Sequence, residues 1–280
     1  MIRQRRVSEK LRPKRKNDAS ESKSPPKAAL SIHRDKIRPA EPNDQDRSIP
    51  HTLALTWETH DLCTKMQGAV DSWAKLDHAL DVRVFNRRER EALVSFDPKV
   101  KNAYHLVSRN SAKADIWRLA YLYLNGGYYS DIDQICKMPV SKFIPGDAEF
   151  VICTRHPRKK PRVPTTANGL MGARPKCKII RYLLYSICEH VIKLARDGKT
   201  KILRECKGHE ITGPLIIGRL LNVAAGRKEG TLWNGGMQKI GNTKAFFVEH
   251  IPRVGFYVDG QFVVKEKYDE YEEAIDRIQR

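Results

Sequence analysis

Residues 114–138 read A-D-I-W-R-L-A-Y-L-Y-L-N-G-G-Y-Y-S-D-I-D-Q-I-C-K-M, and this stretch decides the fold expected for the 280-residue chain. Residues 112–124 predict a helix, because apolar residues recur at the i, i+3, i+4, i+7 spacing of one helical face. The run Asn125-Gly126-Gly127 should end that helix, since Asn and Gly accept the left-handed backbone found at helix C-termini. Two tyrosines, Tyr128 and Tyr129, then begin a predicted strand.

Two acids, Asp131 and Asp133, stand at the end of this predicted strand with Ile132 between them. Because alternate side chains of a strand share a face, we expect both carboxylates on one side and Ile132 in the core. Like charges so close repel each other, and a divalent cation between or beside them would remove the repulsion. Paired acids also cap strands or bind Lys, so the spacing alone leaves the metal and the purely structural interpretation open.

The rest of the chain alternates between strand and helix patterns, which predicts an α/β sheet with crossover helices. Ligands of such sheets gather at the carboxyl ends of strands, where Trp57 and the two acids are expected. Strands are predicted at 53–57, 82–85, 150–154 and in a terminal hairpin that turns at Asp259-Gly260; helices are predicted at 63–76, from 89 to 94, and at 178–196.

Charge separates a tail from a domain. The formal net charge is +19, which suits an anionic partner such as a nucleotide sugar, a phosphorylated acceptor, an acidic membrane surface or nucleic acid. Residues 1–48 hold 14 Lys/Arg and 7 Asp/Glu with almost no apolar runs, so we expect a disordered basic tail there and a single domain over 49–280. The basic run at 12–16 fits a solvated linker, a nucleic-acid patch or a nuclear address.

The expected location is cytoplasmic, or peripheral at a membrane. No stretch has the apolar length of a signal peptide or of a transmembrane helix. The six cysteines show neither a C-x-x-C pair nor zinc-finger spacing, so we interpret all of them as reduced structural residues: Cys63, Cys136, Cys153, Cys177, Cys188 and Cys206.

The order of an A-D-x-x-R helix, an N-G-G turn, two aromatic residues and D-x-D resembles one enzyme family. This family is the glycosyltransferases with the D-x-D sugar-binding region (family 32 type), a group with fungal initiating mannosyltransferases, bacterial capsule-type transferases and the clostridial glucosylating toxins. Further landmarks are similar: a first strand that ends in Trp57, Asn168 within residues 166–171, and the turn Thr212-Gly213-Pro214. Together the landmarks cover roughly residues 49–220.

The resemblance implies a GT-A type fold, with a mixed, mostly parallel central sheet flanked by helices. It also implies a metal-dependent hexosyltransferase of polysaccharide biosynthesis, which moves a sugar from a UDP- or GDP-sugar to a glycan, lipid-linked or protein acceptor and retains the anomeric configuration. In such enzymes the phosphate of the donor helps to deprotonate the acceptor, so no side-chain base is required.

Site roles follow from the same resemblance. Asp133 would be the direct ligand of Mn²⁺ or Mg²⁺, and Asp131 would contact ribose or sugar hydroxyls, partly through the metal shell. The donor would be held by four further residues: Asp115 and Arg118 on the sugar, Trp57 stacked on the base, and Asn168 near the reacting carbon. Without the neighbouring motif, Asp115 and Arg118 would read as a surface helix ion pair and Trp57 as a core aromatic.

Two departures from the family pattern stand out. The family usually places a further metal-site residue near its C-terminus, and residues 265–280 offer no His and no Ser-Trp pair, which leaves His250 as the nearest candidate. The basic loop 155–162 fits a solvated loop or a contact for an anionic acceptor.

Other functions remain alternatives. One is a catalytically inactive relative that binds a nucleotide sugar, and another is a basic nucleic-acid-binding protein, although no zinc, homeodomain, RNP or KH signature is present. A haloacid-dehalogenase phosphatase would want a Thr or Val two residues after the second acid, where Ile135 stands. A two-metal nuclease would need more clustered acids.

Overall fold

The computed structural model describes residues 47–155, 165–205 and 210–267. Its strands form one sheet in the order β2-β1-β3-β6-β5-β8-β9-β10-β4, with β7 paired to β8. The strands are β1 Thr52–Thr56, β2 Asp81–Phe85, β3 Gly127–Ser130, β4 Ile135–Cys136, β5 Phe150–Arg155, β6 Thr166–Ala173, β7 Gly236–Ile240, β8 Thr243–Ile251, β9 Gly255–Val258 and β10 Gln261–Lys265. The helices are α1 Thr64–Leu76, α2 Arg87–Val94, α3 Pro98–Leu106, α4 Asn110–Asn125, α5 Val140–Phe143, α6 Lys178–Arg196, α7 Thr200–Glu205 and α8 Pro214–Ala224.

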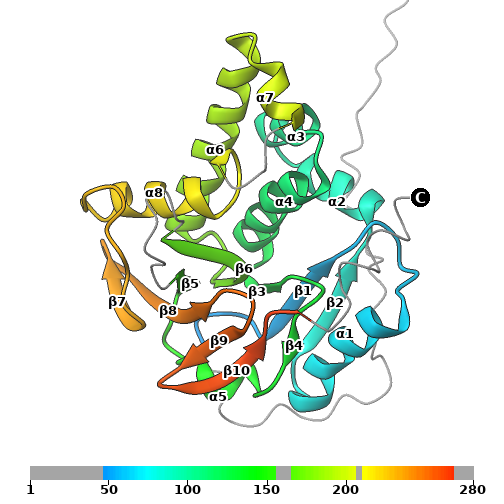
Figure 1. Ribbon diagram of the computed structural model, residues 1–280, viewed down its shortest axis with the longest axis vertical. Coiled ribbons are helices and arrows are strands. Elements are labelled where there is room, and N and C mark those ends of the chain that lie inside the picture. Colours follow the sequence, from blue (N-terminus) through cyan, green and yellow to red (C-terminus); the bar gives the residue numbers. More distant parts are fainter. Residues whose placement is uncertain (1–46, 156–164, 206–209, 268–280) are drawn as a thin grey trace, which may run out of the picture.

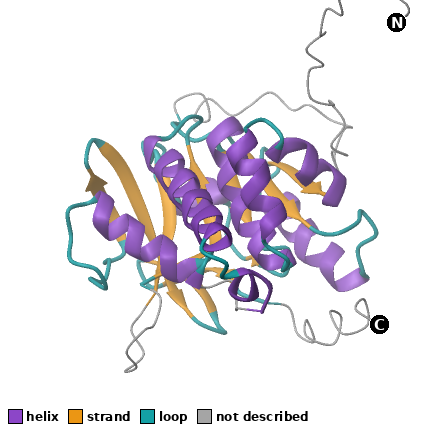
Figure 2. Ribbon diagram, turned by 90° about the horizontal axis from the view of Figure 1, so that it is seen from above, coloured by secondary structure: helices purple, strands orange, loops and turns teal. Residues whose placement is uncertain are grey.

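Helices cover both faces of this sheet (Figure 1). Successive residues of β1 point to opposite sides: Ala54 packs in an apolar cluster with α2, α3, α4, α6, α7 and α8, whereas Leu53 and Leu55 pack in a second cluster with α1 and α5. Figure 2 views the larger helical layer from above, with the helices lying across the strands. The expected α/β sheet flanked by helices is therefore confirmed.

The sheet is mixed, as expected, but antiparallel pairs outnumber parallel ones among the described strands. Parallel pairing joins β1 to β2, β1 to β3, and β5 to β8. The chain after α8 instead returns on itself through β7, β8, β9 and β10 by short turns, which require antiparallel neighbours. The hairpin turn at Asp259-Gly260 is confirmed, with φ of 48° and 76° at its two central residues.

Most predicted elements lie where the sequence placed them. The helix predicted for 112–124 is α4, which ends at Asn125 and is followed by Gly126 with φ 69°, and the helix predicted for 178–196 is α6. The helix predicted from 89 starts earlier, at Arg87, because Asn86 and Glu89 form a capping box.

The strand predicted through the two acids is wrong. β3 ends at Ser130, and the N–H of Gln134 then returns to the carbonyl oxygen of Asp131 at 3.1 Å, which closes a turn. Ile132 is buried, as expected. The acids therefore occupy a turn at the carboxyl end of β3, where their directions depend on contacts rather than on strand alternation.

Several sequence predictions concern residues outside the described ranges: the tail up to residue 46, the basic loop from 156 to 162, and Cys206. Within those ranges, Cys63 is exposed, the other four cysteines are buried, and none forms a disulfide. None of the helices that the structure describes combines the length and apolarity needed to cross a bilayer.

Candidate active site

A cavity of about 510 Å³ opens where α4, the turn after β3 and the first residues of β6 meet. β3 and β6 are neighbours in the sheet, and α4 lies in the helical layer above them (Figure 1). Besides His250, five of the predicted site residues line the cavity: Asp115, Arg118, Asp131, Asp133 and Asn168. The structure thus gathers side chains that α4, a turn and β6 supply separately.

Asp115 is held by three partners. Arg118, one turn further along α4, pairs with it at 3.1 Å between Nη2 and Oδ1. The Oδ1 atom also accepts from Asn168 Nδ2 at 2.8 Å, and Oδ2 accepts from Thr212 Oγ1 at 2.9 Å. Burial raises the pKa of Asp115, and these partners offset only part of that effect. The carboxylate is therefore fixed at both oxygens.

Arg118 connects the other site residues. Its Nη1 donates to the backbone oxygen of Asn168 at 2.5 Å and lies 3.2 Å from Asp131 Oδ1, while Nε donates to the Ala114 carbonyl at 3.3 Å. The guanidinium also lies over the ring of Tyr129, 4.2 Å from its centroid. Burial by itself would lower the pKa of Arg118, but the surrounding negative groups raise it. All three guanidinium nitrogens thus contact protein oxygens.

Asp131 presents one oxygen to the cavity. Its Oδ1 accepts from the Tyr129 hydroxyl at 2.7 Å and pairs with Arg118, and 39% of the side chain is exposed. Gly169 makes this position possible, because a Cβ there would lie 2.7 Å from Asp131 Oδ2. The backbone N–H of Asp131 donates to the Gly169 carbonyl at 2.8 Å, which ties the turn to β6.

Asp133 is more deeply buried than Asp131, with 6% of the residue exposed. Burial, and after it the charge of Asp131, raises the pKa of Asp133 to about 8; the opposing effect of Lys267 is smaller. A buried carboxylate beside a second one offers oxygen ligands that suit a divalent cation. The charge of the cation would stabilise the ionised form of Asp133.

No three His, Cys, Asp or Glu side chains converge on one point within the described parts of the chain. His250, the predicted further candidate, lines the cavity, but its ring stacks on Phe256 at 4.6 Å and Nε2 lies 3.4 Å from Glu266 Oε2. The two acids of the D-x-D turn are carboxylates on this cavity, whose oxygen atoms are the ligand type that a divalent cation prefers.

Trp57 is not among the residues that line the cavity. It directly follows β1, its N–H donates to the Phe85 carbonyl at 3.1 Å, and its own carbonyl accepts from buried Arg90 at 2.7 Å. The side chain packs against the apolar cluster that contains α1. Its predicted stacking on a nucleotide base stays a prediction.

Sequence reasoning missed several contributors to the site. The contact of Tyr129 with Asp131 could have been predicted, because side chains two residues apart along a strand share a face. Thr212 was recognised only as part of a T-G-P landmark. Glu266 and Lys267, which follow β10, also line the cavity. No local sequence pattern predicts this, because their place near the D-x-D turn depends on the order of strands in the sheet.

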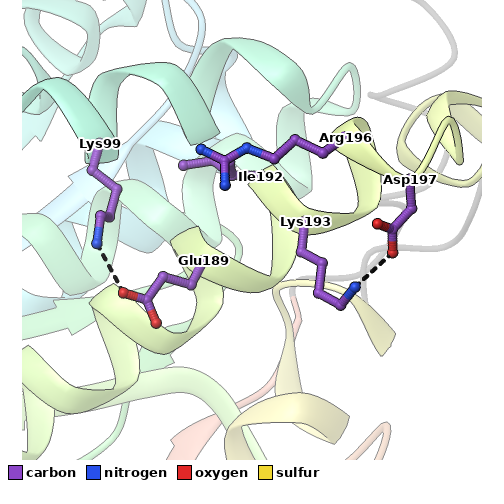
Figure 3. A pocket seen from close by; sticks show the side chains of 6 residues that line it. All are labelled: Lys99, Glu189, Ile192, Lys193, Arg196 and Asp197. Atoms are coloured by element: carbon purple, nitrogen blue, oxygen red, sulfur yellow. Dashed lines mark hydrogen bonds and ion pairs between the residues drawn. The ribbon is translucent and has the colours of Figure 1, made fainter.

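A second hollow of about 560 Å³ lies between α3 and the end of α6 (Figure 3). Four of its charged groups form two pairs, Lys99 with Glu189 and Lys193 with Asp197, each at 2.8 Å, and Arg196 also lines the hollow. The charged groups of this hollow are exposed, whereas the cavity at the D-x-D turn gathers buried charged and polar side chains, so that cavity is the better candidate site.

One comparison with known proteins covers part of this cavity. A family model described as the glycosyltransferase sugar-binding region containing the DXD motif matches residues 64–150, which is less than half of the chain. The matched region contains Asp115, Arg118, Asp131 and Asp133 but neither Trp57 nor Asn168. No curated protein matches the chain.

One similar solved structure is the PaToxG glycosyltransferase. It shares 17% identity with the chain at a TM-score of 0.44, covering 62% of this chain and 69% of the other. Because this score is below 0.5, we rest no assignment on that likeness. The segment from α1 to the start of β5, including both acids of the turn, matches the glycosyltransferase sugar-binding region containing the DXD motif.

Proposed function

We propose that this protein is a divalent-cation-dependent hexosyltransferase of the GT-A and family 32 type. It would move a sugar from a UDP- or GDP-sugar to a glycan, lipid-linked or protein acceptor with retention of configuration, and residues 49–280 would form the transferase domain. The match of residues 64–150 to the sugar-binding region supports sugar transfer in general. The chemistry of the cavity supports a bound cation and a sugar donor, and the other finer statements follow from the resemblance.

The observation that carries the proposal is that the cavity offers hydrogen-bond acceptors. Asn168 uses its amide nitrogen on Asp115, which leaves its amide oxygen without a partner among the described residues. Asp131 likewise keeps Oδ2 for a ligand. Sugar hydroxyls are donors and divalent cations bind oxygen, so such a surface suits both. Arg109, Arg155 and Lys267 also line the cavity and supply positive charge for a diphosphate.

Asp133 and Asp131 would hold Mn²⁺ or Mg²⁺. Proteins often bind Mg²⁺ through one or two carboxylates together with phosphates of the substrate, so a pair of acids fits this role without a third protein ligand. The cation would neutralise the negative charge that develops on the diphosphate when the glycosidic bond breaks.

The remaining roles belong to the chain itself. Asp115 and Asn168 would accept hydrogen bonds from hydroxyls of the donor sugar and so orient the reacting carbon. Arg118 holds both of them and Asp131 in place. Trp57 would stack on the base of the nucleotide, as the resemblance implies. The phosphate of the donor would take the proton of the acceptor, so no side chain is assigned as a base.

A donor screen tests the proposal. Hydrolysis of UDP- and GDP-sugars is measured with and without Mn²⁺ for the wild type, Asp133→Ala and the control Asp71→Ala, which changes an acid on α1 that pairs with Gln67. We expect turnover that requires metal and is lost only in Asp133→Ala. Turnover without metal, or full activity in Asp133→Ala, would overturn the site. Tight donor binding without turnover would instead identify an inactive nucleotide-sugar-binding relative.

A further inference from the structure

The T-G-P turn lies against the candidate site because α8 is fixed to β6. Gly218 of α8 packs against Thr165 so closely that a Cβ there would lie 2.4 Å from the threonine Oγ1. The hydroxyl of Thr166 donates to the Pro214 carbonyl at 3.0 Å, which holds the first residue of α8 on the first residue of β6. Thr212, two residues before α8, is carried to a defined place by these contacts.

The side chain of Thr212 contacts the carboxylate oxygen of Asp115 that Arg118 and Asn168 do not contact. Thr212 is fully buried, and its Oγ1 lies 2.9 Å from Asp115 Oδ2. Arg118 and Asn168 both engage Oδ1. Partners on both oxygens prevent rotation of the carboxylate about its Cβ–Cγ bond, and a carboxylate that cannot rotate keeps a constant direction for its remaining lone pair.

The orientation of Asn168 depends on the same arrangement. Its amide nitrogen donates to Asp115 Oδ1, so its amide oxygen is the atom left for a ligand. A rotation of Asp115 would remove this partner and let the amide turn, which would offer a donor where an acceptor now stands. Thr212 thereby affects two acceptor groups without touching the ligand itself.

We propose that Thr212 is a positioning residue, which sets the direction of the Asp115 carboxylate and, through it, of the Asn168 amide toward hydroxyls of the donor sugar. The inference rests on the proposed function, because it concerns how that same cavity binds its donor. A hydrogen bond from a neutral hydroxyl to a charged carboxylate is strong enough for this role.

The test compares Thr212→Val, which keeps the shape but removes the hydroxyl, with Thr212→Ser, which keeps the hydroxyl. With the donor sugar found in the screen, we expect Thr212→Val to lower kcat/KM about tenfold or more, the size expected for a lost bond to a charged group. The kcat/KM of Thr212→Ser should stay within about threefold of the wild-type value, because the hydroxyl that donates a hydrogen bond to Asp115 is retained. Binding of the free nucleoside diphosphate, which lacks the sugar, should be unchanged in both variants.

Two further measurements separate positioning from damage to the fold. Thr154→Val is the matched control, since this buried threonine donates to the Trp233 carbonyl at 2.5 Å and does not line the cavity; it should lose stability without losing donor use. In an Asp115→Ala background, Thr212→Val should cause no additional loss, because it acts through Asp115. If Thr212→Val does not fold, Thr212→Ala serves in the same comparisons.

The outcomes distinguish this inference from the proposed function. A wild type that neither binds nor hydrolyses any donor defeats both. An active wild type with an unchanged Thr212→Val variant, or an equal loss of sugar-donor and nucleoside-diphosphate binding, overturns the role of Thr212 alone.

Discussion

Replacement of Asp133 by asparagine should stabilise the metal-free protein, and the gain should increase with pH. The pKa of Asp133 is raised from 3.8 to about 8, because its carboxyl group is buried beside Asp131. Between these two values the unfolded chain has released the proton and the folded chain still binds it. The folded state therefore holds more protons, and the free energy of unfolding of the wild type falls as pH rises through this window.

The size of the effect follows from the width of the window. Each pH unit inside this window lowers the free energy of unfolding of the wild type by about 1.4 kcal/mol. Between pH 5 and pH 7 the wild type should therefore lose about 3 kcal/mol of stability, and the asparagine variant should lose none of this amount. Asparagine has a similar shape and no charge, so the comparison isolates the ionisation of Asp133.

Urea unfolding in the presence of a chelator measures this difference at both pH values. The control is Asp197→Asn, which removes an exposed acid paired with Lys193 at 2.8 Å and should change stability little at either pH. A gain from Asp133→Asn that is the same at pH 5 and pH 7 would refute the reasoning, because burial of an ionisable group must produce a pH-dependent cost.

Addition of Mn²⁺ at pH 7 should stabilise the wild type but not the asparagine variant, and so remove most of the difference in unfolding free energy that develops between pH 5 and pH 7. A ligand at 100 times its Kd stabilises the folded state by about 2.7 kcal/mol, and only the wild type keeps the Asp133 carboxylate that would bind it. Equal stabilisation of both proteins by Mn²⁺ would contradict Asp133 as a metal ligand and leave the burial argument intact.

Three other substitutions test the packing of the site. Gly169→Ala should lower metal affinity about tenfold, because the new Cβ would lie 2.7 Å from Asp131 Oδ2 and displace this carboxylate. The control in the same titration is Gly68→Ala on α1, which has open space around it and should leave the affinity unchanged. Arg118→Met should cost about 3–5 kcal/mol in urea unfolding, since it leaves a buried carboxylate unpaired, and a loss below about 1 kcal/mol would argue against the ion pairs. Tyr129→Phe removes the hydroxyl that donates to Asp131 and should weaken metal binding at least tenfold by calorimetry, whereas unchanged binding would show that this bond does not orient the acid.

Local patterns of the sequence determined most of the secondary structure. The apolar periodicity of 112–124 and 178–196 predicted α4 and α6, and Asp259-Gly260 predicted the last hairpin, because each signal lies within one element. The D-x-D acids were correctly expected at the end of a strand. Their strand conformation was wrong, since the bond from Gln134 to Asp131 that closes the turn has no signature in composition or periodicity.

Only the tertiary structure decided which groups these acids and their neighbours contact. Asp115 meets Asn168 across 53 residues of sequence and Thr212 across 97, and both contacts exist because β6 packs on α4 and α8 packs on β6. The raised pKa of Asp133 likewise comes from burial, which no short stretch of sequence specifies. The sequence determined which chemical groups are present and in what order, whereas long-range packing decided which of their atoms are already bonded and which are left for a ligand.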